Sequence, residues 1–414
     1  MMTPGLMLAA VGAVLLLAVW LFYRALRRTT APRRGAGKLV RYPSVTVIRP
    51  IKGLDAGAEQ NIRAAFDHGY PGQVEILFVL DDEGDPAVPV VRRVMRELRE
   101  AGRPFDSRVV FCGQPPPGRT GKLNAMIVGL SLARGRLVAF ADSDIRPDRR
   151  ALSVLVETLL GRRDAGAAFA PVVAPLPTRT VGDAGYSLLL NGLYGAAAAA
   201  ATRRKGGELP FIMGQFMVFR REAIEAIGGL EAADRQLVDD MYLGACLNAN
   251  GWRNVVAAHQ VPIIQQGLAL RDFIGVYRRW ITFSRTGLPG VAFKVTAALH
   301  GVLFWLGVAA ALASAATGHW LAAALNAAVP LALAETINRL HESLGGAALP
   351  WRHRWVAAGL LLAAPAIYLS IFLRRKVDWR GRSYDLDASS RLSGVPAASS
   401  AVEKAPTLAP PRAA

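Results

Sequence analysis

One short stretch limits the fold more than any other: an apolar run, Leu137–Ala141, that ends in the motif Asp142-Ser143-Asp144. Such a run is typical of a buried strand in an α/β sheet, and ligands of these sheets bind beyond the carboxyl ends of the strands. Side chains two residues apart on an extended chain point the same way, so both carboxylates can face one ligand or one hard cation. An isolated motif of this kind is also typical of a solvated turn, with a capping Asp before the helix expected near Asp148.

The region from about Lys38 to Pro289 alternates strand and helix patterns, which predicts an α/β domain. A second strand, Val74–Leu80, also runs straight into acids, from Asp81 to Pro86. The glycine fingerprint of dinucleotide binding is missing after the first strand, and so is a phosphate-cradling loop of the P-loop type. The two acidic strand ends therefore favour a nucleotide-sugar site. The other elements expected here are strands at 44–49, 108–112 and 211–220 and helices at 56–68, 88–100 and 221–227.

Three further groups of polar residues are candidates for the site. An irregular loop rich in proline and glycine delivers Lys122 to the start of a helix. Asp239 and Asp240 lie in the first turn of a later helix, where a single Asp could serve only to stabilise the helix dipole. Arg279 and Trp280 belong to a cationic aromatic cluster, which is most often an anchor at a membrane interface.

Uncharged segments long enough to span a bilayer lie near both ends of the chain. Leu6–Tyr23 is continuously apolar, and a basic cluster without acids follows it rather than precedes it. This order favours a retained anchor over a signal peptide, with its carboxyl-terminal flank in the cytoplasm. Val295–Gly318 and Val356–Leu373 are further candidate spans, whereas the apolar segment Trp320–Ala334 is short. Four spans would leave the basic residues after Leu373 outside and three would leave them inside, so the number of spans and the side of the C-terminus stay open.

Residues 185–202 are apolar and end in a basic triplet, which favours an interfacial helix; a plain buried helix is the alternative. The net charge of +18 fits nucleic acid, anionic lipid or an anionic small substrate, and the neighbouring spans favour lipid over nucleic acid. The two cysteines, Cys112 and Cys246, are expected to be reduced core residues. The tail from Leu386 is rich in Ala, Ser and Pro and is expected to be disordered.

Four motifs in order resemble those of membrane glycosyltransferases of families 2 and 21, and of ceramide glucosyltransferases above all. They are the D-x-x-D-P loop with Asp82 and Asp85-Pro86, Asp142-Ser143-Asp144, the pair Asp239-Asp240, and Arg279-Trp280 of a [QR]-x-x-R-W motif. Shorter similar stretches are Lys122-Leu123-Asn124, Gly228-Gly229-Leu230 and Trp379-Arg380-Gly381. The chain departs from the family at Val276, where Gln or Arg is expected, although Arg278 could substitute.

The resemblance implies an α/β nucleotide-sugar-binding domain of the GT-A fold between membrane helices. The expected division is an anchor at 1–23, a cytoplasmic catalytic domain at 24–290, membrane segments at 291–376 and a basic segment with a tail at 377–414. Asp142 and Asp144 would hold Mg²⁺ or Mn²⁺, and Asp82 would contact the uridine and ribose, with Lys122 adding positive charge nearby. Asp240 would be the general base beside Asp239, and Arg279 and Trp280 would lie over the diphosphate and the acceptor.

The implied reaction is the inverting transfer of glucose from UDP-glucose to the primary hydroxyl of a ceramide-like lipid at a membrane, the inner membrane if the source is bacterial. Two alternatives remain: a hopanoid N-acetylglucosaminyltransferase that uses UDP-GlcNAc, and a polyprenyl-phosphate sugar transferase. A processive polysaccharide synthase would need more spans for a secretion channel. A membrane scaffold without activity would leave the grouped carboxylates unexplained. No feature of the sequence predicts the oligomeric state.

Overall fold

The computed structural model describes residues 3–29, 37–103, 105–287, 290–373, 376–387 and 391–393, with the backbone alone over 286–300. The chain divides into two compact units, each built from separate segments. The helical unit comprises Met1–Ala31, Val173–Arg203 and Gln265–Arg374, and the sheet unit comprises Pro32–Val172, Arg204–Ile264 and Arg375–Ala414. Most of the tail expected to be disordered from Leu386 lies outside the described residues, but Leu386 and Leu392 are buried, so that expectation is wrong for the start of the tail.

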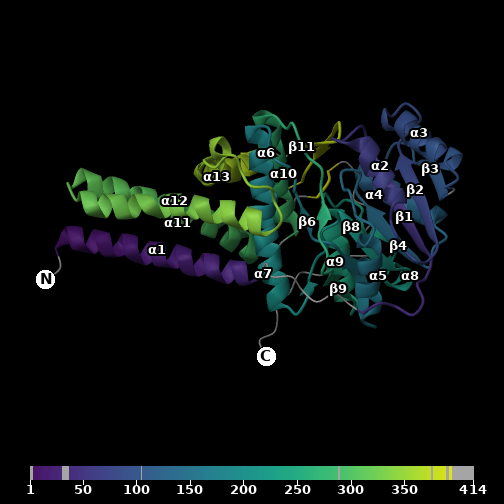
Figure 1. The fold of residues 1–414 in the computed structure, drawn as a ribbon, viewed down its shortest axis with the longest axis horizontal. Coiled ribbons are helices and arrows are strands. Elements are labelled where there is room, and N and C mark those ends of the chain that lie inside the picture. The colour runs from purple at the N-terminus through teal and green to yellow at the C-terminus, as the bar shows by residue number, and fades with distance from the viewer. Residues whose placement is uncertain are drawn as a thin grey trace. The chain divides into compact units, whose positions relative to one another are not determined.

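The sheet unit is built on eight strands in the order β3-β2-β1-β4-β8-β5-β9-β7 (Figure 1). The first four strands along the chain are parallel neighbours, since β1 pairs with both β2 and β4 and β2 pairs with β3. β8 then runs antiparallel between β4 and β5, which makes the sheet mixed. The strands are β1 Val45–Pro50, β2 Val74–Leu80, β3 Asp106–Phe111, β4 Leu137–Ala141, β5 Ala165–Phe169, β7 Glu208–Leu209, β8 Phe216–Arg220 and β9 Arg253–Val256.

The central strands are largely apolar because helices cover both faces of the sheet. Every residue of β4 is buried, as is every residue of β2 after Val74. On one side, Phe66 and Phe78 pack with the apolar face of α3. The helices of this unit are α2 Ala58–Phe66, α3 Ala87–Glu100, α4 Gly121–Leu132, α5 Ala151–Leu160, α8 Arg221–Ala226 and α9 Asp239–Ala249, with a short 3₁₀ turn at Leu230–Ala233. The mixed sheet with flanking helices confirms the predicted fold class.

One expected strand is shorter than predicted. The pattern at 211–220 suggested a continuous strand, but β8 begins only at Phe216. The reason lies at Gly214, whose N–H donates to the carboxylate of Asp240 instead of to a neighbouring strand.

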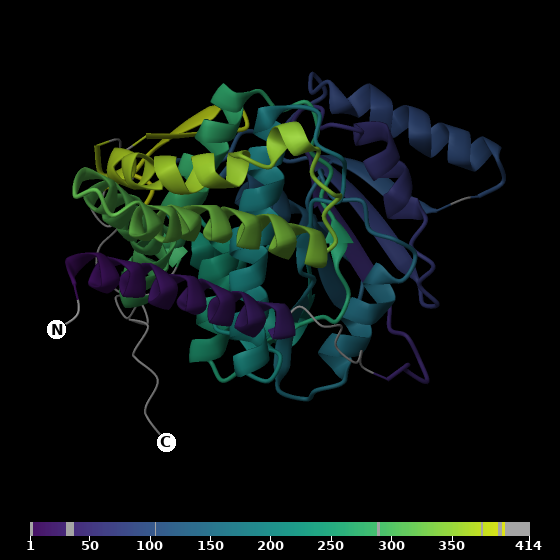
Figure 2. The same ribbon diagram turned by 60° about the vertical axis from the view of Figure 1, so that its left-hand side comes forward.

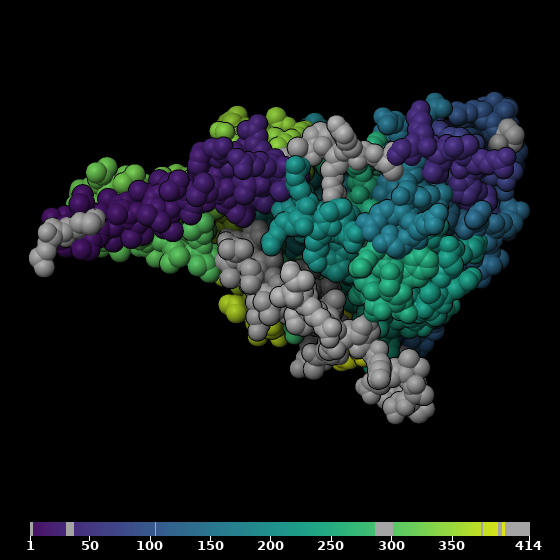
Figure 3. All heavy atoms as spheres, turned by 90° about the horizontal axis from the view of Figure 1, so that it is seen from below, coloured from purple at the N-terminus to yellow at the C-terminus, as the bar shows by residue number. Residues whose placement is uncertain are grey.

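The helical unit is formed by α1 Pro4–Thr29, α10 Leu270–Gly287, α11 Gly290–Ala316, α12 Trp320–Ser343 and α13 Val356–Leu373. α1 lies along α12, and Asn326 of α12 donates a hydrogen bond of 3.0 Å to the carbonyl of Leu8 (Figure 2). The other side of α1 lies on the outer surface, where Leu6 and Val14 are exposed (Figure 3).

Three helices within the described residues are long and apolar enough to cross a bilayer: Pro4–Thr29, Trp320–Ser343 and Trp351–Leu373. The second was expected to be a short segment ending at Ala334, but the helix continues to Ser343. The added turns contain charged residues, and Glu335 among them pairs with Arg354 at 2.7 Å. In the expected span 295–318, only the side chains from Gly301 onward are described.

The segment at 185–202 is helical but irregular. It consists of α6 Val181–Ser187, a π-helical stretch Leu188–Gly195 and α7 Ala196–Arg204. Asn191 is buried and exchanges hydrogen bonds with the backbone of Ala174. The part before Ala196 is therefore packed inside its unit, and an interfacial position stays a prediction for α7.

Candidate functional site

Acidic loops gather at one edge of the sheet because β1 lies between β2 and β4 and all three strands run in parallel. Asp55 follows β1, Asp81 follows β2, and Asp142 and Asp144 follow β4. The loops are joined directly, since the hydroxyl of Ser143 donates a hydrogen bond of 2.5 Å to Asp55. This edge is where α/β sheets bind their ligands.

Lys122 neutralises part of this acidity. Its Nζ lies 2.6 Å from Oδ1 of Asp142 and donates a hydrogen bond of 3.2 Å to the carbonyl of Gly214. The α4 helix delivers it, since Thr120 caps the helix by accepting from the N–H of Leu123. Burial alone would lower the pKa of Lys122, but the carboxylates of Asp142 and its neighbours raise it above the ordinary value. Lys122 is therefore a permanent cation within the cluster.

Asp144 is the least satisfied carboxylate of this group. Its Oδ1 is buried and has no hydrogen-bond partner, while Oδ2 lies 3.9 Å from the guanidinium of Arg380. Burial, with the nearby charges of Asp142 and Asp55, raises the pKa of Asp144 to about 7. The guanidinium near this carboxylate is shared with Asp55, to which Arg380 lies closer.

The Asp142–Asp144 turn is held from beneath by Arg49, which the sequence analysis missed. Arg49 is fully buried on β1 and donates to the backbone carbonyls of Asp142, at 2.9 Å, and of Ile145, at 3.2 Å. Burial lowers its pKa to about 10, against the opposing effect of the nearby carboxylates. The only signal in the sequence was an Arg inside an otherwise apolar strand.

The donor set fits a divalent cation that shares its coordination with a substrate. Asp142 and Asp144 offer carboxylate oxygens, of which Oδ1 of Asp144 is unpartnered. Among the described residues, no group of three or more His, Cys, Asp or Glu side chains could enclose a metal. Mg²⁺ and similar ions are commonly held by one or two carboxylates, with water and substrate phosphates completing the shell.

Asp239 and Asp240 lie at the start of α9, within the electrostatic reach of Lys122. Asp240 accepts from the N–H of Gly214 at 2.5 Å and from its neighbour Met241 at 2.8 Å. Burial and the charge of Asp239 raise the pKa of Asp240 to about 7. Asp239 is buried with its Oδ2 unpartnered, and burial raises its pKa as well. Since Lys122 also pairs with Asp142, one cation links two acidic motifs that lie far apart in the sequence.

Asp82 was expected to face the nucleoside, but of the acids after β2 it is Asp81 and Asp85 that are buried. Asp82 is exposed and accepts from the N–H of Gly84 within its own turn. Its neighbour Asp81 is buried and pairs with Lys52 at 2.6 Å and with Arg382 at 2.7 Å. Asp85 is also buried and accepts from the N–H of Gly53, so it ties together the loops after β1 and β2. A contact of Asp82 with the nucleoside stays a prediction.

Arg279 and Trp280 lie on α10, which belongs to the helical unit. The ring of Trp280 packs against Tyr186, with centroids 5.2 Å apart, and edge-on against Tyr194, with centroids 5.8 Å apart. The structure brings the carboxylates and Lys122 together within the sheet unit. The expected contacts of Arg279 and Trp280 with the diphosphate and the acceptor stay predictions.

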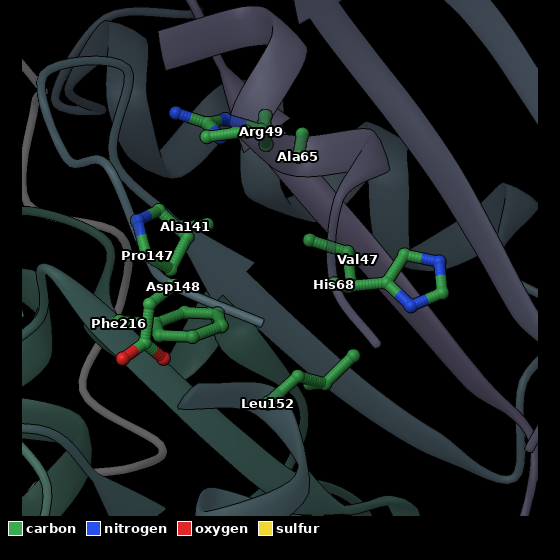
Figure 4. A pocket seen from close by; sticks show the side chains of 10 residues that line it. Val47, Arg49, Ala65, His68, Ala141, Pro147, Asp148, Leu152 and Phe216 are labelled. Carbon is green, nitrogen blue, oxygen red and sulfur yellow. The ribbon is translucent and has the colours of Figure 1, made fainter. Parts of the chain in front are cut away.

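A small cavity lies beneath β1 and β4, lined by Val47, His68, Leu152, Phe216 and others (Figure 4). Its volume of about 20 Å³ has room for roughly one water molecule. A nucleotide sugar cannot enter a cavity of this size, and the acidic cluster after β4 remains the candidate site.

The sequence profile of Glycosyl transferase family 21 matches residues 6–392, nearly the whole chain. Ceramide glucosyltransferase 1 of Caenorhabditis elegans is 24% identical over 251 residues, which is 60% of this chain and 51% of the relative. Ceramide glucosyltransferase of Gibberella zeae is 30% identical over 173 residues, 39% of this chain and 32% of the relative. The chain therefore spans about half, or less, of the length of these relatives.

The fold also resembles that of a solved enzyme. A mannosyltransferase from Pyrobaculum calidifontis, determined in complex with GDP-Man and Mn²⁺, superimposes with a TM-score of 0.53 and 21% sequence identity. The match covers 86% of this chain and 99% of that protein. The mixed α/β sheet is thus of the GT-A glycosyltransferase type.

Proposed function

Because the chain belongs to glycosyltransferase family 21, we propose that it transfers glucose from UDP-glucose to the primary hydroxyl of a ceramide-like membrane lipid, with inversion. The observation that carries this proposal is the cluster in which Lys122 links Asp142 to the pair Asp239 and Asp240. It joins groups suited to a diphosphate leaving group with buried carboxylates suited to proton transfer. The names of the relatives, ceramide glucosyltransferases at 24–30% identity, support the lipid and the sugar.

The leaving group is a nucleoside diphosphate, whose negative charge increases as the bond to the sugar C1 breaks. A divalent cation bound by Asp142 and Asp144 would neutralise that charge. Lys122 remains charged at neutral pH and adds a fixed positive charge beside Asp142. Its position is fixed before the substrate binds, so no reorganisation is needed during the reaction.

The acceptor alcohol is protonated at neutral pH and is a poor nucleophile. A carboxylate within hydrogen-bond reach must take its proton as the oxygen attacks C1. Asp240 is suited to this role, because a pKa of about 7 makes a carboxylate a stronger base than usual while leaving it largely ionised just above neutrality. Displacement in one step from an α-linked donor gives a β-linked product.

Apolar helices near both ends of the chain fit a substrate that is itself a lipid. The donor is soluble and the acceptor hydroxyl lies at the headgroup level of a bilayer. A sheet unit held at the cytoplasmic face would meet both substrates.

The decisive experiment is product identification. The purified protein is incubated with UDP-glucose, UDP-galactose, UDP-GlcNAc or GDP-mannose and with ceramide, diacylglycerol, a hopanoid or polyprenyl phosphate, and the products are analysed by mass spectrometry. We expect a β-linked monoglucosylceramide. A hopanoid amino sugar or an acid-labile polyprenyl phosphodiester as the sole product would replace the proposal with one of those activities, and a polymer would reject single transfer.

A further inference from the structure

The segment that follows α13 forms a hairpin within the sheet unit. β11 Lys376–Trp379 pairs with β12 Arg382–Asp385 across a two-residue turn, Arg380-Gly381. Both turn residues have positive φ, 52° for Arg380 and 73° for Gly381, the combination found in type I′ turns. Glycine or asparagine adopts this conformation easily, whereas Arg does so at a cost. An Arg at this position therefore calls for an explanation beyond the turn itself.

The hairpin is docked by apolar and backbone contacts. Val377, Leu386 and Leu392 are buried, and the N–H of Leu392 donates to the carbonyl of Arg235 at 2.9 Å. The hydroxyl of Tyr384 accepts from the N–H of Gly121, the first residue of α4, at 3.2 Å. These contacts place the hairpin next to the helix start that carries Lys122.

The two arginines of the hairpin nevertheless reach the acidic edge of the sheet. Arg382 donates to Asp81 at 2.7 Å and to the side chain of Gln114 at 2.9 Å. Arg380 pairs with Asp55 and lies 3.9 Å from Asp144. A Cβ added at Gly121 would lie 2.1 Å from Nη1 of Arg382, so the glycine leaves room for the guanidinium.

Charge balance indicates what these guanidinium groups do when substrate is present. Without the hairpin, the edge carries more carboxylates than cations, which would repel a diphosphate. A cation bound at Oδ1 of Asp144 would neutralise the carboxylate whose Oδ2 lies 3.9 Å from Arg380, and so weaken the hold of that carboxylate on Arg380. Arg380 would then be able to bind a phosphate group, since the planar guanidinium fork of arginine matches phosphate oxygens.

We propose that Arg380 and Arg382 bind the diphosphate of the nucleotide-sugar donor, so that the C-terminal hairpin completes the donor site. This inference rests on the proposed function in one respect, that the donor is a nucleoside diphosphate sugar. It does not depend on which sugar or which lipid is used. On donor binding, Arg380 exchanges its contacts with Asp55 and Asp144, and Arg382 its contact with Asp81, for phosphate oxygens of the donor.

The test compares the binding of UDP and of uridine to the full-length protein with Mn²⁺ by calorimetry, independently of turnover. Arg380→Asn removes the charge and creates Asn-Gly, a preferred type I′ turn, so the hairpin itself is retained. Arg382→Lys keeps a charge but loses the planar fork. We expect each substitution to raise the Kd of UDP about tenfold or more and to leave the Kd of uridine unchanged.

Lys376→Met is the matched control, because it removes a cation from the same hairpin. Nζ of Lys376 lies 3.7 Å from Asp385, a loose ion pair. It should leave both Kd values unchanged. Unchanged UDP binding in Arg380→Asn and Arg382→Lys, beside a wild type that binds UDP, would overturn the inference and leave the proposed function intact. The measurement is repeated with GDP, and a wild type that binds neither diphosphate would overturn both.

Discussion

Nζ of Lys122 lies 2.6 Å from Oδ1 of Asp142, and this ion pair connects the helix α4 to the end of the strand β4. The same ammonium group acts electrostatically on Asp239 and Asp240. Asp142 and the pair Asp239 and Asp240, for which we propose metal binding and proton transfer, thus share one neighbouring cation. A substitution at any of these residues should therefore shift the pKa values of the others.

Asp240→Asn keeps the size of the side chain but removes the proton acceptor. We expect kcat to fall by about a hundredfold to ten-thousandfold, with the Kd of UDP largely unchanged. The comparison is Asp239→Asn, in steady-state kinetics and equilibrium binding. If Asp239→Asn is the inactive variant and Asp240→Asn turns over nearly normally, the two roles are reversed, which the unpartnered Oδ2 of Asp239 would then explain.

The rate should depend on pH through the ionisation of Asp240. A general base works when deprotonated and the pKa of Asp240 is raised to about 7, so kcat/KM should fall as the pH drops below about 7. Asp239 contributes to raising this pKa and Lys122 to lowering it. The residual activity of Asp239→Asn should therefore show its acid limb at lower pH, and that of Lys122→Met at higher pH. Shifts in the same direction for both variants would exclude Asp240 as the titrating group.

Activity should require a divalent cation. We expect loss of transfer in EDTA, recovery with Mg²⁺ or Mn²⁺, and weaker Mn²⁺ binding by Asp144→Asn, measured by electron paramagnetic resonance of the free ion. Asp148→Asn is the control, because that carboxylate lies on the same loop but pairs with His259. Full activity after thorough chelation would favour the alternative of a simple capped turn after β4.

Gly214→Ala should disturb the site although it replaces no charged residue. An added Cβ would lie 2.5 Å from Oδ2 of Asp240, so the carboxylate or the loop must move. We expect a fall in kcat of tenfold or more, since small displacements of a catalytic group are costly. Gly37→Ala is the control because nothing lies within 4 Å of its Cβ position. Equal kinetics of the two variants would show that Asp240 need not be held where the structure has it.

The docked hairpin also predicts membrane topology. The chain leaves the sheet unit near Gln265 and returns to it after Arg374, and Arg382 contacts Asp81 directly. A membrane must therefore be crossed an even number of times between these points, so α11, α12 and α13 cannot all span it. In a cysteine-free background, Glu83→Cys and Asp378→Cys should react with an impermeant maleimide from the same side of sealed vesicles. Labelling from opposite sides would contradict the hairpin's position.

The parts of the fold that were predictable from sequence are those decided by local pattern. β2 occupies the expected residues because its run Ile76–Leu80 is continuously apolar, which is typical of a strand covered on both faces. The same reasoning located Asp142 and Asp144 at a strand end. Asp239 and Asp240 could be placed in a first helical turn, but only the folded chain brings them to Lys122.

The missed features depend on partners distant in the sequence. The role of Arg49 depends on the carbonyls of Asp142 and Ile145, which follow β4 and lie far from Arg49 in the sequence. The length of α12 depends on Arg354, which pairs with the acid near its end. The hairpin arginines are separated from Asp81 and Asp55 by 301 and 325 residues, and no periodicity reports such contacts.

These long separations affect the order in which the molecule is completed during synthesis. The ribosome makes the acidic loops first and the segment 376–393 only after α11, α12 and α13 have been synthesised. A nascent chain can thus fold its sheet and insert its helices while the partners of Asp55 and Asp81 are still missing. In the proposed arrangement a diphosphate finds Arg380 and Arg382 in place only once this hairpin has been made, and a chain truncated after α13 would lack both arginines.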